Sequence, residues 1–251
     1  MITIKTPEEI EIMAEGGKIL AEVMKKLEKK AKPGVATIEL DRAAEALILS
    51  WPGGHPARPA FKGYDGFPNS LCVSINENIV HGLPSDYILK EGDVVGLDLG
   101  VLYKGYNTDM AITFAVGKVS FEAKRLIDVT KKSLRLAIKK AKVGNTTGDI
   151  GNTIQRFVED QGFGVVRDLC GHGIGKKLHE EPKIPNFGKR ESGEKLVEGI
   201  VIAIEPMVTM GDYNLKKSND GYGYATKDNS LSAHFEHTIA ITKSGPKILT
   251  Q

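Results

Sequence analysis

The chain has 251 residues, of which 41% are hydrophobic and 26% charged, so it is long enough to bury a substantial core. Its net charge of +2 argues against a protein whose main task is to neutralise nucleic-acid phosphates. Neither an apolar run of the ~18 residues that cross a bilayer nor an apolar signal core occurs, and two cysteines are too few for a disulfide framework. We therefore expect a cytoplasmic protein that needs neither a membrane nor a nucleic acid for its activity.

The first predicted element is a helix that begins at Pro7. Thr6 can cap this helix, proline suits its first turn, and Glu9 completes a capping box. Apolar residues then recur at helical spacing as far as Ala31. A second helix is expected after Thr37.

The phrase that ends the first helix occurs twice in the chain. K-K-A-K-P-G from Lys29 returns as K-K-A-K-V-G from Lys139, and a threonine follows each phrase. A second pair of helices is therefore expected near Ser120 and Thr147, with a break at Val143–Asn145. The repeat predicts one domain, residues 1–251, built from two halves of roughly 1–118 and 119–251 and related by a pseudo-twofold axis.

Short apolar runs follow each predicted helix pair. In each half the order is helices first and then several strands, which predicts an α+β fold with an antiparallel sheet covered by helices. Two polar segments, 52–70 and 211–230, are expected to be loops that overhang a site. The predicted strands are Leu71–Ile75, Val94–Leu102, Ala111–Val116, Gly164–Leu169, Val201–Ile204 and His237–Thr242.

Each half carries two acids at matching places. Asp98 and Glu205 end apolar strand-like runs, whereas Asp109 and Glu236 are expected to open the next strand. A hairpin turn near Tyr103–Gly105 would place Asp98 and Asp109 nearly opposite one another on adjacent strands. A histidine precedes each first acid, in H-G-L-P at 81 and in H-E-E-P at 179.

Such buried carboxylates need a cation, because an unpaired buried charge is too costly. The strands that bear them hold no lysine or arginine next to the acids, so divalent metal ions are the better candidates. Four carboxylates with one imidazole suit two ions ~3.5–4 Å apart. His172 in G-H-G-I-G is the natural imidazole, because the flanking glycines let the backbone approach closely.

At these residues the chain resembles the type I methionine aminopeptidases of the simple bacterial kind, over essentially its whole length. The resemblance implies the two-repeat pita-bread fold and removal of the initiator methionine from new polypeptides. The matching phrases are N-E-N-I-V-H-G from Asn76, D-L-G-V-L-Y-K-G-Y-N-T-D from Asp98, G-H-G-I-G from Gly171, H-E-E-P from His179, I-E-P from Ile204 and F-E-H-T from Phe235.

The resemblance also assigns roles within a centre of two divalent ions, whether Co, Mn, Fe(II) or Zn. Glu205 would bind metal and carry a proton, His179 would hydrogen-bond the oxyanion, and His81 would hold the new amide or its nitrogen. The expected ligands are Asp98, Asp109, His172, Glu205 and Glu236, with Asp109 and Glu236 bridging. The expected substrate pocket consists of Tyr64, Phe67, Cys72, His81, Leu178, His179 and Tyr222.

Three positions depart from the family pattern. An aromatic residue is usual at Leu178, tryptophan is common at Tyr222, and glutamine is usual at His234. Because His234 lies two residues before Glu236, it is expected to point from the same strand face toward the metals.

Two other activities compete with this interpretation. An X-Pro dipeptidase or aminopeptidase of the same fold would share the ligands but usually carries a large extra N-terminal domain. A non-catalytic binding relative would be expected to lose ligands, whereas all five are present. The expected partner is the N-terminal methionine of nascent chains, for which the family prefers a small second residue. Transient ribosome contact through the basic run from Lys25 to Lys32 is a further hypothesis, and a monomer is expected.

Overall fold

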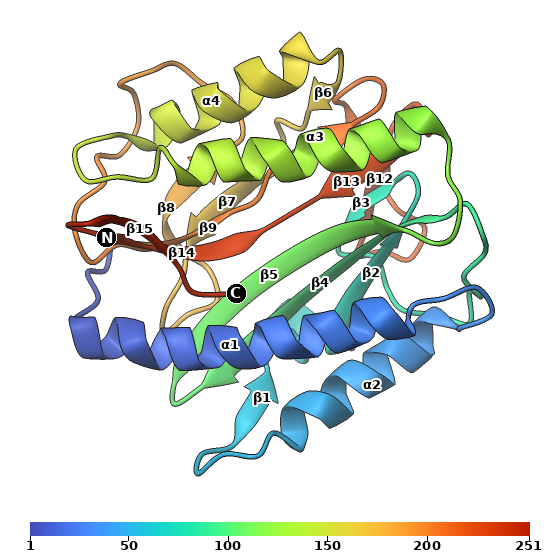
Figure 1. The fold of residues 1–251 in the computed structure, drawn as a ribbon, viewed down its shortest axis with the longest axis horizontal. Coiled ribbons are helices and arrows are strands. Elements are labelled where there is room, and N and C mark those ends of the chain that lie inside the picture. The colour runs from blue at the N-terminus through green and yellow to red at the C-terminus, as the bar shows by residue number, and fades with distance from the viewer.

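The computed structural model describes residues 1–251 as helices packed over one face of a set of antiparallel strands (Figure 1). No helix combines the length and the apolar composition that crossing a membrane requires. The helices are α1 (Pro7–Lys30), α2 (Thr37–Leu49), α3 (Phe121–Ile138) and α4 (Thr147–Asp160), with one 3-10 turn, η1 (Tyr64–Gly66). The strands are β1 (Ala57–Pro59), β2 (Leu71–Ile75), β3 (Asn78–Val80), β4 (Val94–Tyr103), β5 (Tyr106–Ala115), β6 (Gly164–Val165), β7 (Cys170–Gly173), β8 (Glu180–Pro185), β9 (Val201–Ile204), β10 (Met207–Thr209), β11 (Leu215–Lys217), β12 (Tyr224–Thr226), β13 (Ser232–His234), β14 (His237–Thr242) and β15 (Gly245–Ile248).

Two larger sheets meet near the middle of the molecule. In the first half, β4 pairs with β1, β2 and β5, and in the second half the order is β15-β14-β9-β7-β8. Two three-stranded sheets, β13-β10-β6 and β11-β12-β3, complete the strand layer. β5 and β14 are the strands that lie against each other where the two larger sheets meet.

The helices begin where the sequence predicts. The Thr6 side chain accepts a hydrogen bond from the Glu9 backbone N–H, and the Glu9 side chain accepts one from the Thr6 N–H, which completes the capping box of α1. Ser120 caps α3, and Thr146 caps α4 through a second capping box with Asp149. These helices, together with the antiparallel sheets that they cover, confirm the predicted α+β fold class.

Several strand predictions need correction. The segment predicted from Gly164 forms only two residues of strand before the chain turns into β7. Asp109 lies inside β5, which starts earlier than predicted, at Tyr106. The two polar segments are not wholly loops, since 52–70 contains β1 and η1, and 211–230 contains the β11–β12 hairpin. The Gly, Asn and Tyr content of these segments indicated loops, but β1 is stabilised by pairing with β4 and β12 by pairing with β3.

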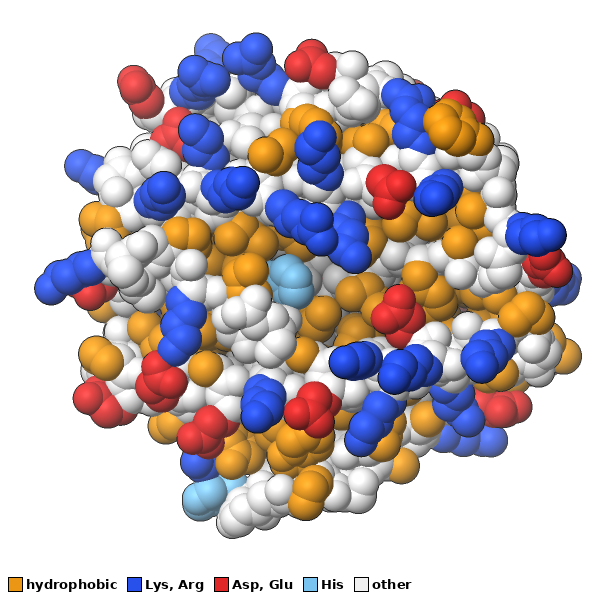
Figure 2. Space-filling model, viewed as in Figure 1, with side chains coloured by type: hydrophobic (Ala, Val, Ile, Leu, Met, Phe, Trp, Pro, Cys, Tyr) orange, Lys and Arg blue, Asp and Glu red, His pale blue; other side chains and the backbone are white.

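Each helix pair covers its own apolar core. One cluster joins α1 and α2 to β2 and β4, and a second joins α3 and α4 to β9 and β14. Ile112 on β5 packs against both clusters, so it links the two halves. The face covered by helices carries many lysine and arginine side chains (Figure 2). Of the lysines of α1, Lys25, Lys26, Lys29 and Lys30 are exposed.

Candidate metal and peptide site

A cavity of about 340 Å³ opens where the two halves meet. All twelve residues that the sequence suggested for a site line it. They are Tyr64, Phe67, Cys72, His81, Asp98, Asp109, His172, Leu178, His179, Glu205, Tyr222 and Glu236. A larger groove of about 650 Å³ shares His81, His172, His179 and Glu205 with the cavity and leads past Thr3 and Met1.

The first half contributes its two acids from one regular hairpin. β4 and β5 pair along their whole length, and the turn falls at Lys104 and Gly105, both with positive φ. The expectation that Asp98 and Asp109 are nearly opposite is wrong, because Asp98 pairs with Ala111 and Asp109 pairs with Gly100. The two carboxylates are diagonal neighbours on the same face of the hairpin.

The second half contributes its groups from interruptions in strands. His172 sits in β7 at a register shift between Gly171 and Gly173. A Cβ on Gly171 would lie 2.4 Å from the Ala203 carbonyl oxygen, so only glycine allows this approach of the backbones. Glu205 follows the last residue of β9.

Glu236 occupies the seam between the halves. It lies between β13 and β14, and its backbone N–H donates to the Ala111 carbonyl of β5 at 2.9 Å. Thr238 of β14 also bonds to β5, because its hydroxyl donates to the Asp109 carbonyl and accepts from the Asp109 N–H. These bonds fix the position of Glu236 relative to Asp109.

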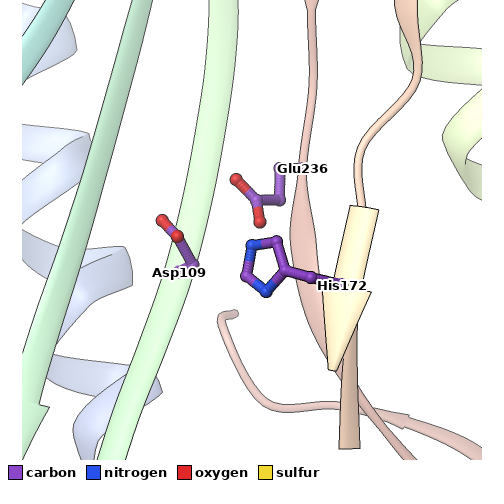
Figure 3. Close-up of side chains that lie close together, drawn as sticks. All are labelled: Asp109, His172 and Glu236. Carbon is purple, nitrogen blue, oxygen red and sulfur yellow. The ribbon is translucent and has the colours of Figure 1, made fainter. Parts of the chain in front are cut away.

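Three potential ligands meet in this region. Ligand atoms of Asp109, His172 and Glu236 all lie within 4.8 Å of one another, and they come from β5, from β7 and from the segment beside β14 (Figure 3). The residues are largely buried, so the arrangement differs from the exposed acidic clusters common on protein surfaces.

The carboxylates are electrostatically uncompensated. Burial, above all, raises the pKa of Asp98 to about 6, and burial together with the charge of Asp98 raises the pKa of Asp109 well above its ordinary value. Burial and the neighbouring Asp109 raise the pKa of Glu236 in the same way. Asp98 Oδ1 and Glu236 Oε1 are buried without any hydrogen-bond partner. A site of this kind fits divalent cations, which supply the missing positive charge and accept oxygen ligands.

Glu205 lies between two imidazoles. Its Oε1 is 3.7 Å from His172 Nε2, and its Oε2 is 3.4 Å from His234 Nε2. Burial acts to raise the pKa of Glu205, but the neighbouring imidazoles, that of His234 first, outweigh it, so the pKa is lowered. The expectation that His234 points toward the site agrees with this contact, although β13 ends before Glu236.

His179 stands at the mouth of the cavity. Its ring centroid is 4.3 Å from that of His172, and its Nδ1 lies 2.9 Å from the hydroxyl of Tyr64. Desolvation, followed by the effect of His172, lowers the His179 pKa to about 4, so the ring is neutral at pH 7. Because burial raises the pKa of Tyr64, its hydroxyl keeps its proton and can donate to Nδ1, which leaves an N–H on Nε2.

The segment that follows His179 is anchored to the N-terminus. Glu180 forms an ion pair of 2.8 Å with Lys5, both side chains nearly buried, and also accepts a hydrogen bond from Thr3. The Lys177 N–H donates to the same carboxylate. The N-terminal residues therefore hold the His179 segment against the groove.

One wall of the cavity is apolar. Phe67 packs edge-on against Tyr222, and the buried Leu178 and Cys72 complete the surface. Cys72 pairs across the sheet with Asp98, and burial with that charge raises the pKa of the thiol, which stays protonated. The wall can take an apolar side chain.

Sequence reasoning missed part of the lining. Phe61, Lys217 and Tyr224 come from the two polar segments that were expected to be loops. The alternation of Tyr222 and Tyr224 around a glycine was the available sign of a strand there. The remaining lining residues that were not predicted are Asp65, Leu169 and Gly221.

Comparison with known proteins agrees with this geometry. The profile of metallopeptidase family M24 matches residues 11–243. The chain therefore belongs to that family, and it is a metal-dependent exopeptidase of the pita-bread fold.

Two relatives show which kind of exopeptidase within family M24 the chain resembles. The chain is 50% identical to methionine aminopeptidase from Clostridium perfringens, covering 100% of this chain and 99% of that protein. The crystal structure of methionine aminopeptidase from Thermotoga maritima superposes with a TM-score of 0.97 at 43% identity, with 100% of both chains covered. Within family M24 the chain belongs to the methionine aminopeptidases.

A prolidase shares the fold of this chain but is less similar to it than the methionine aminopeptidases are. The prolidase from Pyrococcus horikoshii shares the fold with a TM-score of 0.78 at 26% identity, but this chain covers only 63% of it. Because the chain is 50% identical to a methionine aminopeptidase over its full length, the X-Pro alternative is not favoured.

Proposed function

We propose that the protein removes the N-terminal methionine from newly made polypeptides, with residues 1–251 acting as one catalytic domain. The observation that supports this most is the convergence of four carboxylates and one imidazole on a single cavity, with two buried carboxylate oxygens left without partners. The names of the most similar relatives point to the same reaction.

The proposed metal ligands come from both halves. Asp98, Asp109, His172, Glu205 and Glu236 would hold two divalent ions, with Asp109 and Glu236 shared between them. When bound, such ions polarise a peptide carbonyl and lower the pKa of water to near neutrality. The donor set accepts Mn, Fe(II), Co or Zn.

The remaining chemistry belongs to side chains. Glu205, held ionised by its imidazole neighbours, would take a proton from the attacking water and pass it to the departing amine. His179 would donate from Nε2 to the oxygen that gains charge, since Tyr64 occupies Nδ1. His81 would hold the new amide or its nitrogen.

The cavity and the groove that adjoins it would together select the substrate. The apolar wall made by Phe67, Cys72, Leu178 and Tyr222, with Tyr64 at its edge, would receive the methionine side chain. The adjoining groove would receive the rest of the chain, and a small second residue would pass most easily. The substrate's free α-amine would lie at the metal end, so only chain ends would be cut.

The proposed setting is the cytoplasm, where a monomer would act on chains still emerging from the ribosome. The exposed lysines at the end of α1 are the proposed contact with the ribosome. Reversing the charges of Lys25, Lys26, Lys29 and Lys30 should weaken co-sedimentation with ribosomes. Unchanged co-sedimentation would remove this contact.

A peptide panel tests the activity. The protein loaded with Mn(II) or Co(II) should release methionine from Met-Gly-Met and much less from Met-Leu-Met, and it should leave X-Pro-X peptides intact. Mass spectrometry of the products distinguishes the three results. Cleavage of X-Pro-X without cleavage of Met-Gly-Met would refute the proposal. Asp109→Asn, purified and loaded in the same way, is the matched inactive control.

A further inference from the structure

We propose that His234 is a positioning residue that holds Glu205 in its working orientation by donating a hydrogen bond from Nε2 to Oε2. The inference rests on the proposed function of Glu205 and goes beyond it, because His234 does not line the cavity and would act only through Glu205.

The backbone of His234 is fixed from two directions. His234 on β13 pairs with Met207 on β10, and Met207 lies two residues after Glu205 in the chain. Thr113 of β5 donates its hydroxyl to the His234 carbonyl at 2.7 Å and accepts the His234 N–H at 2.9 Å. The backbone of His234 is therefore anchored to both halves, and only 3% of its side chain is exposed.

The Nε2 atom of His234 lies beside the Glu205 carboxylate. Nε2 of His234 is buried and has no conventional hydrogen-bond partner, while Glu205 Oε2 lies 3.4 Å away. An ionised carboxylate offers only lone pairs, so Nε2 must carry a hydrogen for the two groups to satisfy each other. A shift of a few tenths of an ångström brings the pair to ordinary hydrogen-bond length.

Glu205 needs such a partner. Its side chain is only 12% exposed, and its other oxygen faces His172, a proposed metal ligand. Without His234, Oε2 would have no donor in a buried position and the carboxylate could rotate. A residue that must both bind metal and transfer a proton would lose both abilities when its orientation is lost.

Three variants separate the hydrogen bond from packing. His234→Leu keeps apolar volume but cannot donate, and His234→Asn keeps polarity but is too short to reach Oε2. His234→Gln carries an amide N–H at a reach similar to Nε2. Thermal melting of each metal-free variant checks that it folds, and the Asn variant replaces the Leu variant if the latter does not.

The readouts are the Mn(II) dissociation constant from EPR titration, the visible spectrum of the Co(II) form, and kcat and KM on Met-Gly-Met. Outer partners of metal ligands typically change affinity or activity by ~10- to 100-fold. We expect a loss of that size in Mn(II) affinity and kcat for Leu and Asn, with KM nearly unchanged. The Gln variant should stay within ~3-fold of the unmodified protein, because its donor restores the bond.

Two results would overturn the proposal. One is a Leu variant that matches the unmodified protein in Mn(II) affinity and kcat. The other is a Gln variant as damaged as Leu, with an altered Co(II) spectrum in both, which would make His234 a direct ligand. If the unmodified protein fails to cleave Met-Gly-Met, the proposed function fails, but the Mn(II) and Co(II) measurements still decide the role of His234.

Discussion

Asp41 of α2 and Gly151 of α4 lie 110 residues apart at equivalent places in the two halves, yet they attach their helices to the sheets in different ways. The Asp41 carboxylate accepts from the backbone N–H groups of Ser70 and Leu71 and from the side chain of Asn69. Gly151 has no side chain, and a Cβ there would lie 2.5 Å from the Phe187 carbonyl oxygen. One junction depends on hydrogen bonds and the other on close approach of backbones.

The same contrast runs through the site. The first half presents Asp98 and Asp109 from an uninterrupted hairpin, whereas the second presents its groups at a register shift, after a strand end and between two strands. The repeated architecture therefore tolerates different local solutions, provided that the carboxylates reach the seam. The two halves should consequently respond differently to equivalent changes.

The largest expected effect comes from Asp109→Asn in the regular hairpin. Loss of this proposed shared ligand should lower metal affinity and reduce kcat/KM by at least ~1,000-fold. The metal-free variant should instead be more stable than the unmodified protein at neutral pH, because the raised pKa values of Asp109 and Glu236 make stability fall as pH rises above the ordinary carboxyl value. Calorimetry with and without Mn(II) measures the stability of the metal-free variant and the stability that it gains from the metal. A variant that gains as much stability from Mn(II) as the unmodified protein would contradict the assignment.

The next effect lies in the second half. His179→Ala should keep its metal but lose ~100-fold or more in kcat, because it removes a donor to the developing negative charge. Tyr64→Phe should lose only about 10-fold or less, since it removes one neutral hydrogen bond that fixes the ring. Kinetics on Met-Gly-Met together with metal analysis test the pair. Near-normal turnover of His179→Ala would remove His179 from the reaction.

Asp41→Ala tests the first junction. It leaves the backbone N–H groups of Ser70 and Leu71 without partners, so unfolding should become easier by about 3 kcal/mol. Urea denaturation gives the value, with Glu39→Ala, an exposed change in the same helix, as the control. Equal stability of the two variants would show that the carboxylate does not anchor α2.

Gly151→Ala tests the second junction. Alanine normally strengthens a helix by about 1 kcal/mol over glycine, but here its Cβ would collide with backbone oxygens of Pro185 and Phe187. We expect a net loss of about 2 kcal/mol. Arg156→Ala, an exposed change in α4, is the control. A Gly151→Ala variant that is more stable than this control would exclude the close contact.

The smallest effect concerns pH and the start of β14. Desolvation lowers the pKa of His237 to about 4, below the value of ~6.5 in the unfolded chain. The unfolded state therefore binds more protons between these values, and stability should be lost as pH falls from 6.5 to 4. His237→Asn should flatten that part of the stability curve, measured without metal. Parallel curves for the two proteins would contradict the assigned pKa.

Local patterns carry most of the fold. The capping box at Thr6, the 110-residue repeat and the apolar periodicity located α1 to α4, and β2, β9 and β14 match their predicted bounds. The polar segments were misinterpreted because β1, β11 and β12 are short and gain stability from partner strands rather than from their own composition. Register was the other error, since the pairing of Asp109 with Gly100 depends on where the turn closes.

The sequence by itself determined which groups are available for the proposed chemistry, because the kinds and spacing of Asp98, Asp109, His172, Glu205 and Glu236 are covalent facts. Tertiary structure alone decided which atoms meet. The approach of Glu236 to Ala111, of Tyr64 to His179 and of His234 to Glu205 joins residues from separate strands and segments. Such contacts depend on how whole sheets pack, and local preference along a chain does not encode the distance between two sheets.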